Sequence, residues 1–472
     1  MTTYTFDQLL KSVTVGEGEG AAVRDPATDE ILGHAPQSTE DDLNAAVEAA
    51  RAAQKTWATL SHDERSEYLN KAADAIEANT DALAELLSRE QGKPITNGPN
   101  ALFEVGACSA WMRSSASFPI EPEVVLDDES GYAELHYVPI GVVGAIGPWN
   151  WPMMISIWQI APALRMGNTV VLKPSEYTPL SVLALGRVMN DVLPEGVLQV
   201  LAGGGDLGKA MTAHDGIDKI TFTGSTETGK AIMRSAASDM KRLTLELGGN
   251  DAGIVLDDVD PKEIAEGLFW GAFINTGQTC AALKRLYVPE SIYDDVCDAL
   301  AEVAGAMPMG RGIEEQNVLG PLQNRAQYDV VARLVEAARS SGARILIGGN
   351  PDDRAPGNFY PVTLVADIDN DNPLVAEEQF GPVLPIVKYT DLDQAIEWAN
   401  GLDVGLGSSV WSSSRERALK VAHRLEAGTT WINQHGTLDP RVPFGGIKES
   451  GEGLEFGVEG LKQMALPKII SG

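Results

Sequence analysis

Cys280 is the cysteine of this chain whose surroundings favour chemistry, because it closes the stretch AFINTGQTCA at residues 272–281. The Gly-Gln-Thr segment before it is typical of a turn, where a thiol can face a ligand. A thiolate is the strongest side-chain nucleophile near neutral pH, but a free thiol has a pKa of about 8.5 and ionises only slightly there. Cys280 is therefore a candidate nucleophile that needs help from its neighbours. Cys108, on the apolar side of a helix-like stretch, is expected to be core packing.

Glu246 is a carboxylate in an unusual place, within LELGG at the end of an apolar, strand-like run. Burial of a carboxylate is costly unless hydrogen bonds or a function compensate. Two interpretations are open at this point: a functional carboxylate, or a Glu that caps the Gly-Gly turn.

Two glycine-rich patterns resemble phosphate-binding loops. Residues 203–208, GGGDLG, fit G-x-G-x-x-G after a strand, but Thr223 occupies the place where a dinucleotide fold usually has an acidic residue. Residues 224–230, GSTETGK, fit G-x-x-x-x-G-K, but Ala231 follows where a nucleotide hydrolase needs Ser or Thr for Mg²⁺. Both patterns still offer free backbone N–H groups at a helix start, which suits a pyrophosphate; the alternative is a tight turn that needs Gly for its shape.

These motifs are separated by alternating strand-like and helix-like segments. Apolar strand-like runs lie at 143–146, 169–173, 197–201, 219–223 and 243–247. After Gly249 the alternation restarts, with runs at 254–256, 286–288, 344–348, 383–389, 407–411 and 429–433. Such alternation predicts parallel sheets with helices on both faces and ligands at the carboxyl ends of the strands. The predicted fold is α/β, with two Rossmann-like doubly wound parallel-sheet domains.

Amphipathic helices are predicted before the first sheet, over 41–60, 65–91 and 100–117. Period-two patterning over 119–137 predicts a β-hairpin, and the tail at 461–470 is a candidate for a further strand beside it. The hairpin is either an arm onto another subunit or a plain surface ribbon.

Composition restricts the partners. The chain has 472 residues and a formal charge of -31, which disfavours nucleic acids and anionic membranes, because phosphate groups are bound by clustered Lys and Arg. Three scattered cysteines form neither a disulfide framework nor a zinc site, and no metal is expected. The N-terminal segment lacks the pattern of a signal peptide, and no run approaches the length of a membrane span, so a cytoplasmic protein is expected.

Seven motifs follow one another along the chain: GPWNWP (147–152), VLKPSE (171–176), FTGSTETG (222–229), LELGGN (245–250), FINTGQTC (273–280), EEQFGP (377–382) and PFGGIKESG (443–451). Together they resemble the aldehyde dehydrogenase superfamily, over a stretch from about residue 20 to the C-terminus. The resemblance implies an NAD(P)-binding domain at 1–117 and 139–249, a catalytic domain at 250–440, and an oligomerisation arm at 118–138 and 455–472 of a homodimer or homotetramer.

The resemblance also implies a mechanism. Cys280 adds to an aldehyde to form a thiohemiacetal, hydride passes to nicotinamide, and water cleaves the resulting thioester to release the acid. Asn150 and the backbone N–H of Cys280 would bind the oxyanion, and Glu246 would activate the water. Glu246 favours hydrolysis over transfer to CoA. The alternatives are a CoA-acylating aldehyde dehydrogenase, a thioesterase-like hydrolase that uses Cys280 and Glu246, or a non-catalytic binding protein that retains the fold.

For the cofactor, Lys173 and Glu176 resemble the pair that reaches the adenosine ribose. A carboxylate there accepts hydrogen bonds from free hydroxyls and repels a 2′-phosphate, so NAD is favoured over NADP, which stays possible. The full set of expected cofactor-binding residues is Trp149, Lys173, Glu176, Gly204, Gly208, Phe222, Gly224, Ser225, Thr228, Leu247, Gln327, Glu378 and Phe380.

A substrate tunnel is expected from position within the same motifs, lined by Trp151, Met154, Trp158, Ile274, Thr279, His435, Leu438 and Phe444. Its composition favours an apolar or aromatic aldehyde, and no Arg is present to bind a second carboxylate. His435 either contacts substrate or closes its loop. One departure from the family pattern concerns Gln159, which stands where many relatives have Lys, although the acidic partner Glu455 is retained; a proton relay through this pair is therefore in doubt.

Overall fold

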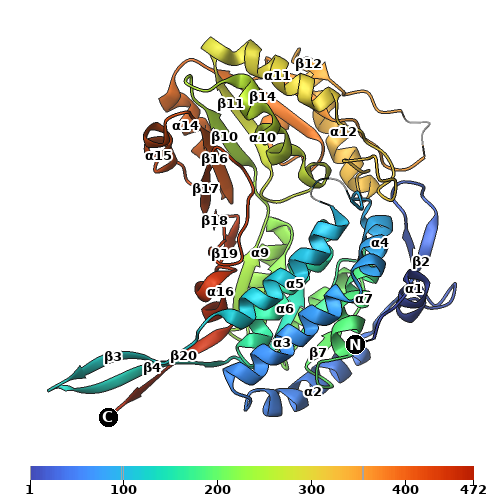
Figure 1. The fold of residues 1–472 in the computed structure, drawn as a ribbon, viewed down its shortest axis with the longest axis vertical. Coiled ribbons are helices and arrows are strands. Elements are labelled where there is room, and N and C mark those ends of the chain that lie inside the picture. Colours follow the sequence, from blue (N-terminus) through green and yellow to red (C-terminus); the bar gives the residue numbers. More distant parts are fainter. Residues whose placement is uncertain (1, 97, 99, 353–355) are drawn as a thin grey trace.

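Two large, mainly parallel sheets organise the molecule, one in each half, in the computed structural model, which describes residues 2–96, 98, 100–352 and 356–472 (Figure 1). The first sheet has the strand order β19-β9-β8-β5-β6-β7, and β19 runs antiparallel to β9. Its strands are β5 (Val142–Ile146), β6 (Thr169–Lys173), β7 (Leu198–Val200), β8 (Lys219–Thr223), β9 (Arg242–Glu246) and β19 (Gly451–Glu452). All five strand-like runs predicted before residue 249 overlap strands of this sheet.

Both faces of the first sheet are covered by helices. In β5, Val143 and Ala145 enter one core, whereas Val142 and Ile146 enter another, because successive side chains of a strand point to opposite faces. Helices α2, α8 and α9 contribute to one of these cores, and α6 and α7 to the other. The helices of this half are α1 (Phe6–Val13), α2 (Glu40–Trp57), α3 (His62–Glu77), α4 (Thr80–Gln91), α5 (Ala101–Ser117), α6 (Pro152–Arg165), α7 (Pro179–Asn190), α8 (Gly205–Ala213) and α9 (Thr226–Ala236).

Local sequence signals explain where several of these helices begin. The hydroxyl groups of Thr39 and Ser61 accept hydrogen bonds from the third residue of α2 and of α3, and the acidic side chains of Asp42 and Glu64 accept from the cap N–H groups in return. Such capping boxes satisfy backbone donors that a helix start leaves free. A two-stranded hairpin, β1 (Gly20–Arg24) and β2 (Ile31–Pro36), lies between α1 and α2.

The second sheet has the order β12-β13-β14-β11-β10-β16-β17, with all neighbours parallel except β12 and β13. Its strands are β10 (Asp251–Val255), β11 (Leu283–Pro289), β12 (Arg344–Ile347), β13 (Thr363–Ala366), β14 (Val383–Tyr389), β16 (Gly407–Trp411) and β17 (Thr429–Ile432). The helices of this half are α10 (Pro261–Phe273), α11 (Tyr293–Gly305), α12 (Arg325–Ser340), α13 (Pro373–Ala376), α14 (Leu392–Asn400) and α15 (Arg415–Ala422), with short 3₁₀ turns η1 (Ile274–Gly277) and η2 (Glu290–Ile292). These two sheets confirm the predicted α/β fold with two parallel-sheet units. The sequence pattern missed β13, which is only four residues long.

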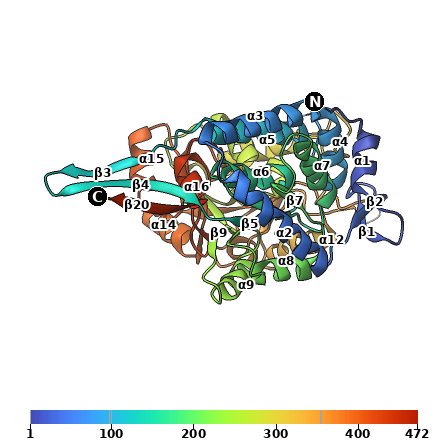
Figure 2. The same cartoon turned by 90° about the horizontal axis from the view of Figure 1, so that it is seen from below.

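A three-stranded antiparallel ribbon, here called the arm, projects from the body of the molecule (Figures 1 and 2). It consists of β3 (Glu123–Asp128), β4 (Gly131–Pro139) and β20 (Ala465–Ser471), and the central β4 pairs with both others. The predicted hairpin and the predicted pairing of the tail with it are therefore confirmed. The short helix α16 (Gly457–Gln463) leads into β20, and β15 (Val404–Gly405) pairs with β18 (Ile447–Lys448).

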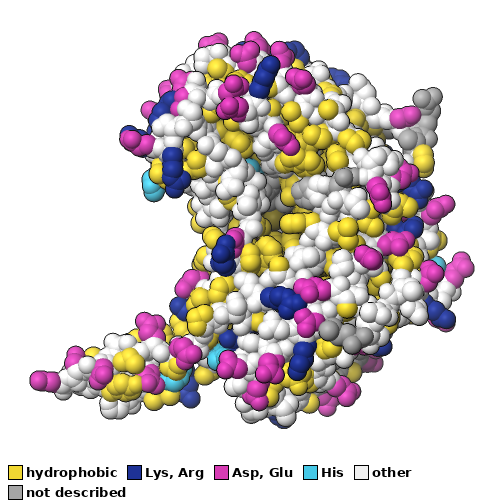
Figure 3. Space-filling view, viewed as in Figure 1, with side chains coloured by type: hydrophobic (Ala, Val, Ile, Leu, Met, Phe, Trp, Pro, Cys, Tyr) yellow, Lys and Arg dark blue, Asp and Glu magenta, His cyan; other side chains and the backbone are white. Residues whose placement is uncertain are grey.

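On the face seen in Figure 3, the surface is hollowed between the two halves, and hydrophobic side chains gather along this hollow. Lys and Arg are scattered among Asp and Glu on the same face. Among the described helices, none combines the length and the apolar character needed to cross a bilayer.

Candidate active site

A cavity of about 880 Å³ lies at the carboxyl ends of four strands of the first sheet. The segments that follow β5, β6, β8 and β9 form one side of it, and Cys280, Gln327, Glu378 and Phe380 line it from the other half of the chain. The carboxyl edge of a parallel sheet is where ligands of such folds bind. This cavity is therefore the candidate active site.

Cys280 reaches the cavity through an unusual turn. Asn275, Thr276 and Gly277 all have positive φ values, of 51°, 59° and 75°, in the 3₁₀ turn η1. A Cβ atom at Gly277 would lie 2.1 Å from the carbonyl oxygen of Gly381. Glycine is thus required there both for its backbone conformation and for the close approach of another chain segment. The turn ends the helical path of α10 and brings Cys280 to the cavity.

The electrostatic surroundings of Cys280 do not favour an anion. The pKa of the Cys280 thiol is raised to about 12, chiefly by burial and also by the carboxyl groups of Glu246, Asp251 and Glu378, although the ammonium group of Lys284 acts to lower it. Burial disfavours the charged form of any thiol, and a neighbouring cation favours it. Lys284 is therefore the side chain whose charge assists ionisation of Cys280.

Asn150 lies beside the Cys280 segment. Its side-chain Nδ2 donates a hydrogen bond to the carbonyl oxygen of Gln278 at 2.9 Å, and it lines the same cavity as Cys280. One amide hydrogen is engaged in this way, and Nδ2 carries a second. The backbone carbonyl of Asn150 accepts from Nδ2 of Asn275 at 2.8 Å and from Nζ of Lys93 at 3.0 Å. Asn150 is thus anchored at its side chain and at its backbone.

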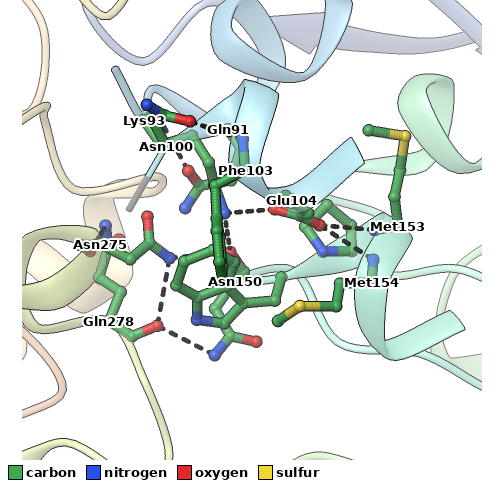
Figure 4. A network of polar contacts seen from close by, with 12 residues as sticks. Gln91, Lys93, Asn100, Phe103, Glu104, Asn150, Met153, Met154, Asn275 and Gln278 are labelled. Carbon is green, nitrogen blue, oxygen red and sulfur yellow. Dashed lines mark hydrogen bonds and ion pairs between the residues drawn. The ribbon is translucent and has the colours of Figure 1, made fainter. Parts of the chain in front are cut away.

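A buried ion pair supports this arrangement (Figure 4). Nζ of Lys93 contacts Oε2 of Glu104 at 2.5 Å and lies 3.6 Å from the ring centre of Trp151. Oε1 of Glu104 accepts hydrogen bonds from the backbone N–H groups of Met153 and Met154, in the first turn of α6. The pair therefore joins α5, the start of α6 and the Asn150 loop into one polar network.

Glu246 and Glu455 are two buried carboxyl groups close enough to influence each other. The pKa of Glu246 is raised well above its ordinary value, chiefly by burial and also by the charge of Glu455, and burial raises the pKa of Glu455 to about 8. Neither carboxylate oxygen of Glu246 has a hydrogen-bond partner within the described part of the chain. An unpartnered buried carboxyl with a raised pKa has the properties of a general base or acid.

Gln159 does not join these two carboxyl groups in the structure. Its Nε2 donates to the carbonyl oxygen of Ile146 at 3.2 Å and to Oγ1 of Thr223 at 3.3 Å. These two hydrogen bonds to the first sheet fix the orientation of the Gln159 side-chain amide.

Twelve of the thirteen expected cofactor-binding residues line the cavity: Trp149, Lys173, Glu176, Gly208, Phe222, Gly224, Ser225, Thr228, Leu247, Gln327, Glu378 and Phe380. Gly204 is not among the lining residues, but a Cβ atom there would lie 2.8 Å from Oε2 of Glu176. Glycine at this position therefore leaves space for Glu176.

The start of α9 fits a pyrophosphate group. Ser225 caps this helix by accepting a hydrogen bond from the N–H of Thr228, and Gly224, Ser225, Thr226 and Thr228 all face the cavity. Free N–H groups and the positive end of the helix dipole attract anions at such a place. The residues present thus fit a dinucleotide: those at the start of α9 would hold its phosphates, and Glu176 would face its adenosine end.

The eight expected tunnel residues do not line the described cavity. Trp151, Met154, Trp158 and Phe444 are buried in the core of the first half, and Ile274 and Leu438 pack against it. Trp158 lies edge to face against Phe456, which also stacks on Phe444. The indole N–H of Trp151 donates to Oγ1 of Thr279 at 2.9 Å, directly beside Cys280. The structure therefore collects an aromatic cluster near the nucleophile segment.

The side chain of His435 is fully enclosed. Its Nδ1 is 2.9 Å from Oγ of Ser409, its Nε2 is 3.5 Å from Asp251, and its side chain has 0% exposure. Of the two roles considered for His435, the structure favours closure of its loop, because the ring contacts the second sheet.

Sequence reasoning missed Lys93, Glu104 and Lys284 as members of the site. Charged residues are expected at the surface, and nothing in their spacing marks Lys93 and Lys284 as buried. A signal was nevertheless present for Glu104, which lies one helical turn before Cys108 and hence on the same face, already assigned to the core. Over residues 2–96, 98, 100–352 and 356–472, no cluster of His, Cys, Asp and Glu has the arrangement of a metal site.

Comparison with known proteins agrees with the family resemblance of the sequence motifs. The profile of the Aldehyde dehydrogenase family matches residues 14–470. The aldehyde dehydrogenase LUC3 of Fusarium sp is 38% identical over 467 residues, which is 99% of this chain and 98% of that protein. The phenylacetaldehyde dehydrogenase of Pseudomonas fluorescens is 39% identical over 93% of this chain and 90% of that protein. The NAD+ complex of an aldehyde dehydrogenase from Bacillus cereus is 36% identical, with a TM-score of 0.93, and covers 98% of this chain and 94% of that one.

Proposed function

This chain belongs to the aldehyde dehydrogenase family and oxidises an aldehyde with NAD(P)+, and on that premise we propose that Cys280 is the nucleophile, Asn150 the oxyanion donor and Glu246 the general base. The observation that carries the proposal is the hydrogen bond from the Asn150 side chain to the carbonyl of Gln278, two residues before Cys280. It brings the amide and the thiol to one cavity from opposite halves of the chain.

The residues act in sequence. The Cys280 thiolate adds to the aldehyde carbonyl, and the oxygen that becomes negative is stabilised by Nδ2 of Asn150 and the N–H of Cys280. Bound NAD(P)+ would supply the hydride acceptor, and departure of the hydride from the adduct would leave an acyl group on the sulfur of Cys280. Glu246 then removes a proton from water, which attacks the thioester, releases the carboxylic acid and restores the thiol. Glu246 is buried, and its carboxylate has no hydrogen-bond partner among the residues that the structure describes, so it is free to orient that water.

The proposal is tested with Cys280→Ser. This variant should lose NADH formation from phenylacetaldehyde by at least about 10³-fold, because a hydroxyl is a far weaker nucleophile than a thiolate. NAD binding, measured by calorimetry, should be retained. Turnover equal to that of the unmodified enzyme would exclude Cys280 as the nucleophile.

We propose an apolar or aromatic aldehyde as substrate. The support is the aromatic cluster of Trp158, Phe444 and Phe456, together with Trp151 beside Thr279. The phenylacetaldehyde dehydrogenase relative is consistent with this class. An absorbance screen at the NADH band with aliphatic, aromatic and charged aldehydes tests it, and a preference for an aldehyde that carries a carboxylate would contradict it.

NAD is the proposed physiological cofactor. Glu176 faces the cavity beyond the end of β6, next to Lys173, whose Nζ donates to the carbonyl of Pro174 at 2.8 Å. A carboxylate at this place accepts ribose hydroxyl groups and repels a 2′-phosphate. Kinetics with both cofactors check the preference.

Three further proposals concern organisation and location. The separate sheets support a division into a domain at 1–117 with 139–249, a domain at 250–440, and an arm at 118–138 with 455–472.

A homodimer or homotetramer joined through the arm is supported by its exposed apolar side chains, Val124, Val125, Ile469 and Ile470. Sedimentation analysis would show a monomer if this were wrong. A cytoplasmic location is supported by three free cysteines, one of them the proposed nucleophile, and is checked by cell fractionation.

A further inference from the structure

Lys284 is a buried cation directly behind the nucleophile segment. It lies on β11, its side chain is 2% exposed, and its Nζ donates to the carbonyl oxygens of Thr279 at 2.9 Å and Cys280 at 2.5 Å. Its third contact is an ion pair with Oε1 of Glu378 at 3.2 Å. Two of the three donors of the ammonium group thus make hydrogen bonds to the segment that carries the thiol, and its charge faces Glu378. The side chain is therefore fixed on the segment that carries the thiol.

The contact with Thr279 concerns the peptide unit that ends in the N–H of Cys280. In a trans peptide the C=O and N–H groups point in opposite directions. A cation held on the Thr279 oxygen consequently fixes the direction of the Cys280 N–H and strengthens it as a donor, because a charge on the oxygen polarises the whole unit. This N–H is the second oxyanion donor in the proposed mechanism.

The position of Lys284 beside Cys280 also affects the charge state of the Cys280 thiol. The ionisable groups that act on the thiol come from four segments: Glu246 at the end of β9, Asp251 at the start of β10, Lys284 on β11 and Glu378 after α13. Three are carboxyl groups that disfavour a thiolate, and Lys284 opposes them. In a buried setting a single positive charge has a large effect, because water screens it poorly.

We propose that Lys284 is a positioning residue for the nucleophile: it orients the Cys280 peptide as an oxyanion donor and supplies the positive charge that favours the Cys280 thiolate. This inference rests on the proposed function of Cys280. It also implies that Glu378 opposes Lys284, because the two are paired. Loss of Lys284 and loss of Glu378 should therefore change thiol reactivity in opposite directions.

The test measures alkylation of Cys280 by iodoacetamide across a range of pH, without aldehyde or cofactor, with modification located by mass spectrometry. The variants are Lys284→Met, which removes the charge at similar length, Lys284→Arg, which keeps it, and Glu378→Gln. Cys280→Ser provides the blank, because Cys108 and Cys297 are both buried.

In Lys284→Met the midpoint of the alkylation profile should move to higher pH, and the rate at a fixed pH below it should fall about tenfold for each unit of that shift. Lys284→Arg should stay near the unmodified profile, and Glu378→Gln should move to lower pH. With phenylacetaldehyde and NAD, Lys284→Met should also lose kcat by about 10²-fold, the size expected when an oxyanion donor is impaired.

An unchanged or lower midpoint in Lys284→Met would overturn the inference. If circular dichroism shows that this variant does not fold, Glu378→Gln decides alone, and a midpoint that stays or rises in that variant overturns it. The proposed function fails separately, if Cys280→Ser retains turnover.

Discussion

Lys93 and Glu104 form an ion pair of 2.5 Å, with both side chains completely buried, immediately behind the backbone carbonyl of Asn150. Neither residue belongs to the seven motifs that identify the family. The pair nevertheless decides where the Asn150 loop lies, because Lys93 binds its carbonyl and Glu104 binds the first turn of α6. Removal of one partner from a buried pair leaves the other uncompensated.

Glu104→Gln should lower the free energy of unfolding by about 3 kcal/mol, since the ammonium of Lys93 would stay buried without a counter-charge. Urea unfolding measures the change. Glu416→Gln is the matched control, because Glu416 pairs with Lys420 on the exposed face of α15, and such pairs contribute about 1 kcal/mol or less. Equal effects of the two substitutions would contradict the structural role of the buried pair.

Gly277→Ala should abolish measurable oxidation. The new Cβ would collide with the Gly381 carbonyl, and the positive φ of 75° disfavours any side chain. Gly342→Ala separates the two causes, because Gly342 has a similar φ of 88° but open space around its Cβ position. That control should lose only about 1–2 kcal/mol of stability, from the left-handed conformation, and should keep its activity. Activity assays and thermal unfolding of both variants provide the measurement.

Glu246→Gln should retain a rapid first turnover and lose steady-state rate. Acyl transfer to Cys280 does not need the base, whereas hydrolysis of the thioester does, and general-base catalysis contributes about 10²–10⁴-fold. Rapid-mixing absorbance at the NADH band would show a burst of about one equivalent, followed by slow turnover. A steady-state rate equal to that of the unmodified enzyme would exclude Glu246, and release of the acyl group to added CoA alone would favour the acylating alternative.

Glu455→Gln should flatten the dependence of stability on pH. Folding raises the pKa of Glu455 from 4.5 to about 8, so the folded protein holds this proton more tightly than the unfolded chain between these values. The corresponding stability is fully present below pH 4.5 and is lost as the pH rises through 8, with a slope of at most about 1.4 kcal/mol per unit.

Urea unfolding at several pH values from 5 to 9 measures that slope. Asp439→Asn is the control, because the pKa of Asp439 is lowered to about 2 by Arg441, and its titration lies below this range. The free energy of unfolding should therefore depend on pH less steeply in Glu455→Gln than in Asp439→Asn. The hydrolytic rate of Glu455→Gln should also reach its plateau at lower pH, because the charge that raises the pKa of Glu246 is removed.

Glu176→Gln should improve the use of NADP and weaken that of NAD. The carboxylate that repels a 2′-phosphate is lost, and so is the stronger acceptor for ribose hydroxyl groups. The ratio of kcat/KM for the two cofactors should shift by roughly tenfold or more toward NADP, because that is the effect on binding expected from one charge-assisted hydrogen bond. Glu195→Gln, at an exposed position outside the cavity lining, should leave the ratio unchanged.

The local patterns of the sequence were sufficient for most of the fold. Apolar runs such as 169–173 and 219–223 are strands of the first sheet, and the hairpin and tail form the arm. These elements depend on short-range periodicity, which a single sequence displays. The strand β13 escaped because it follows β12 with no helix between them, outside the alternation of strands and helices on which the prediction depended. The family itself was recognisable from seven motifs, and the match over residues 14–470 confirms it.

The sequence by itself determined the parallel-sheet fold, the family and the residue types that can attack a carbonyl. The catalytic roles of Cys280, Asn150 and Glu246 stay predictions. Only the tertiary structure decided that Lys93, Glu104 and Lys284 are buried and which groups they contact. The physical reason is that burial of a charge depends on partners distant along the chain: Lys93 contacts Asn150 across 57 positions, and Lys284 on β11 contacts Glu378, which follows α13. No spacing within one segment records such contacts, because they form only when the folded chain brings distant segments together.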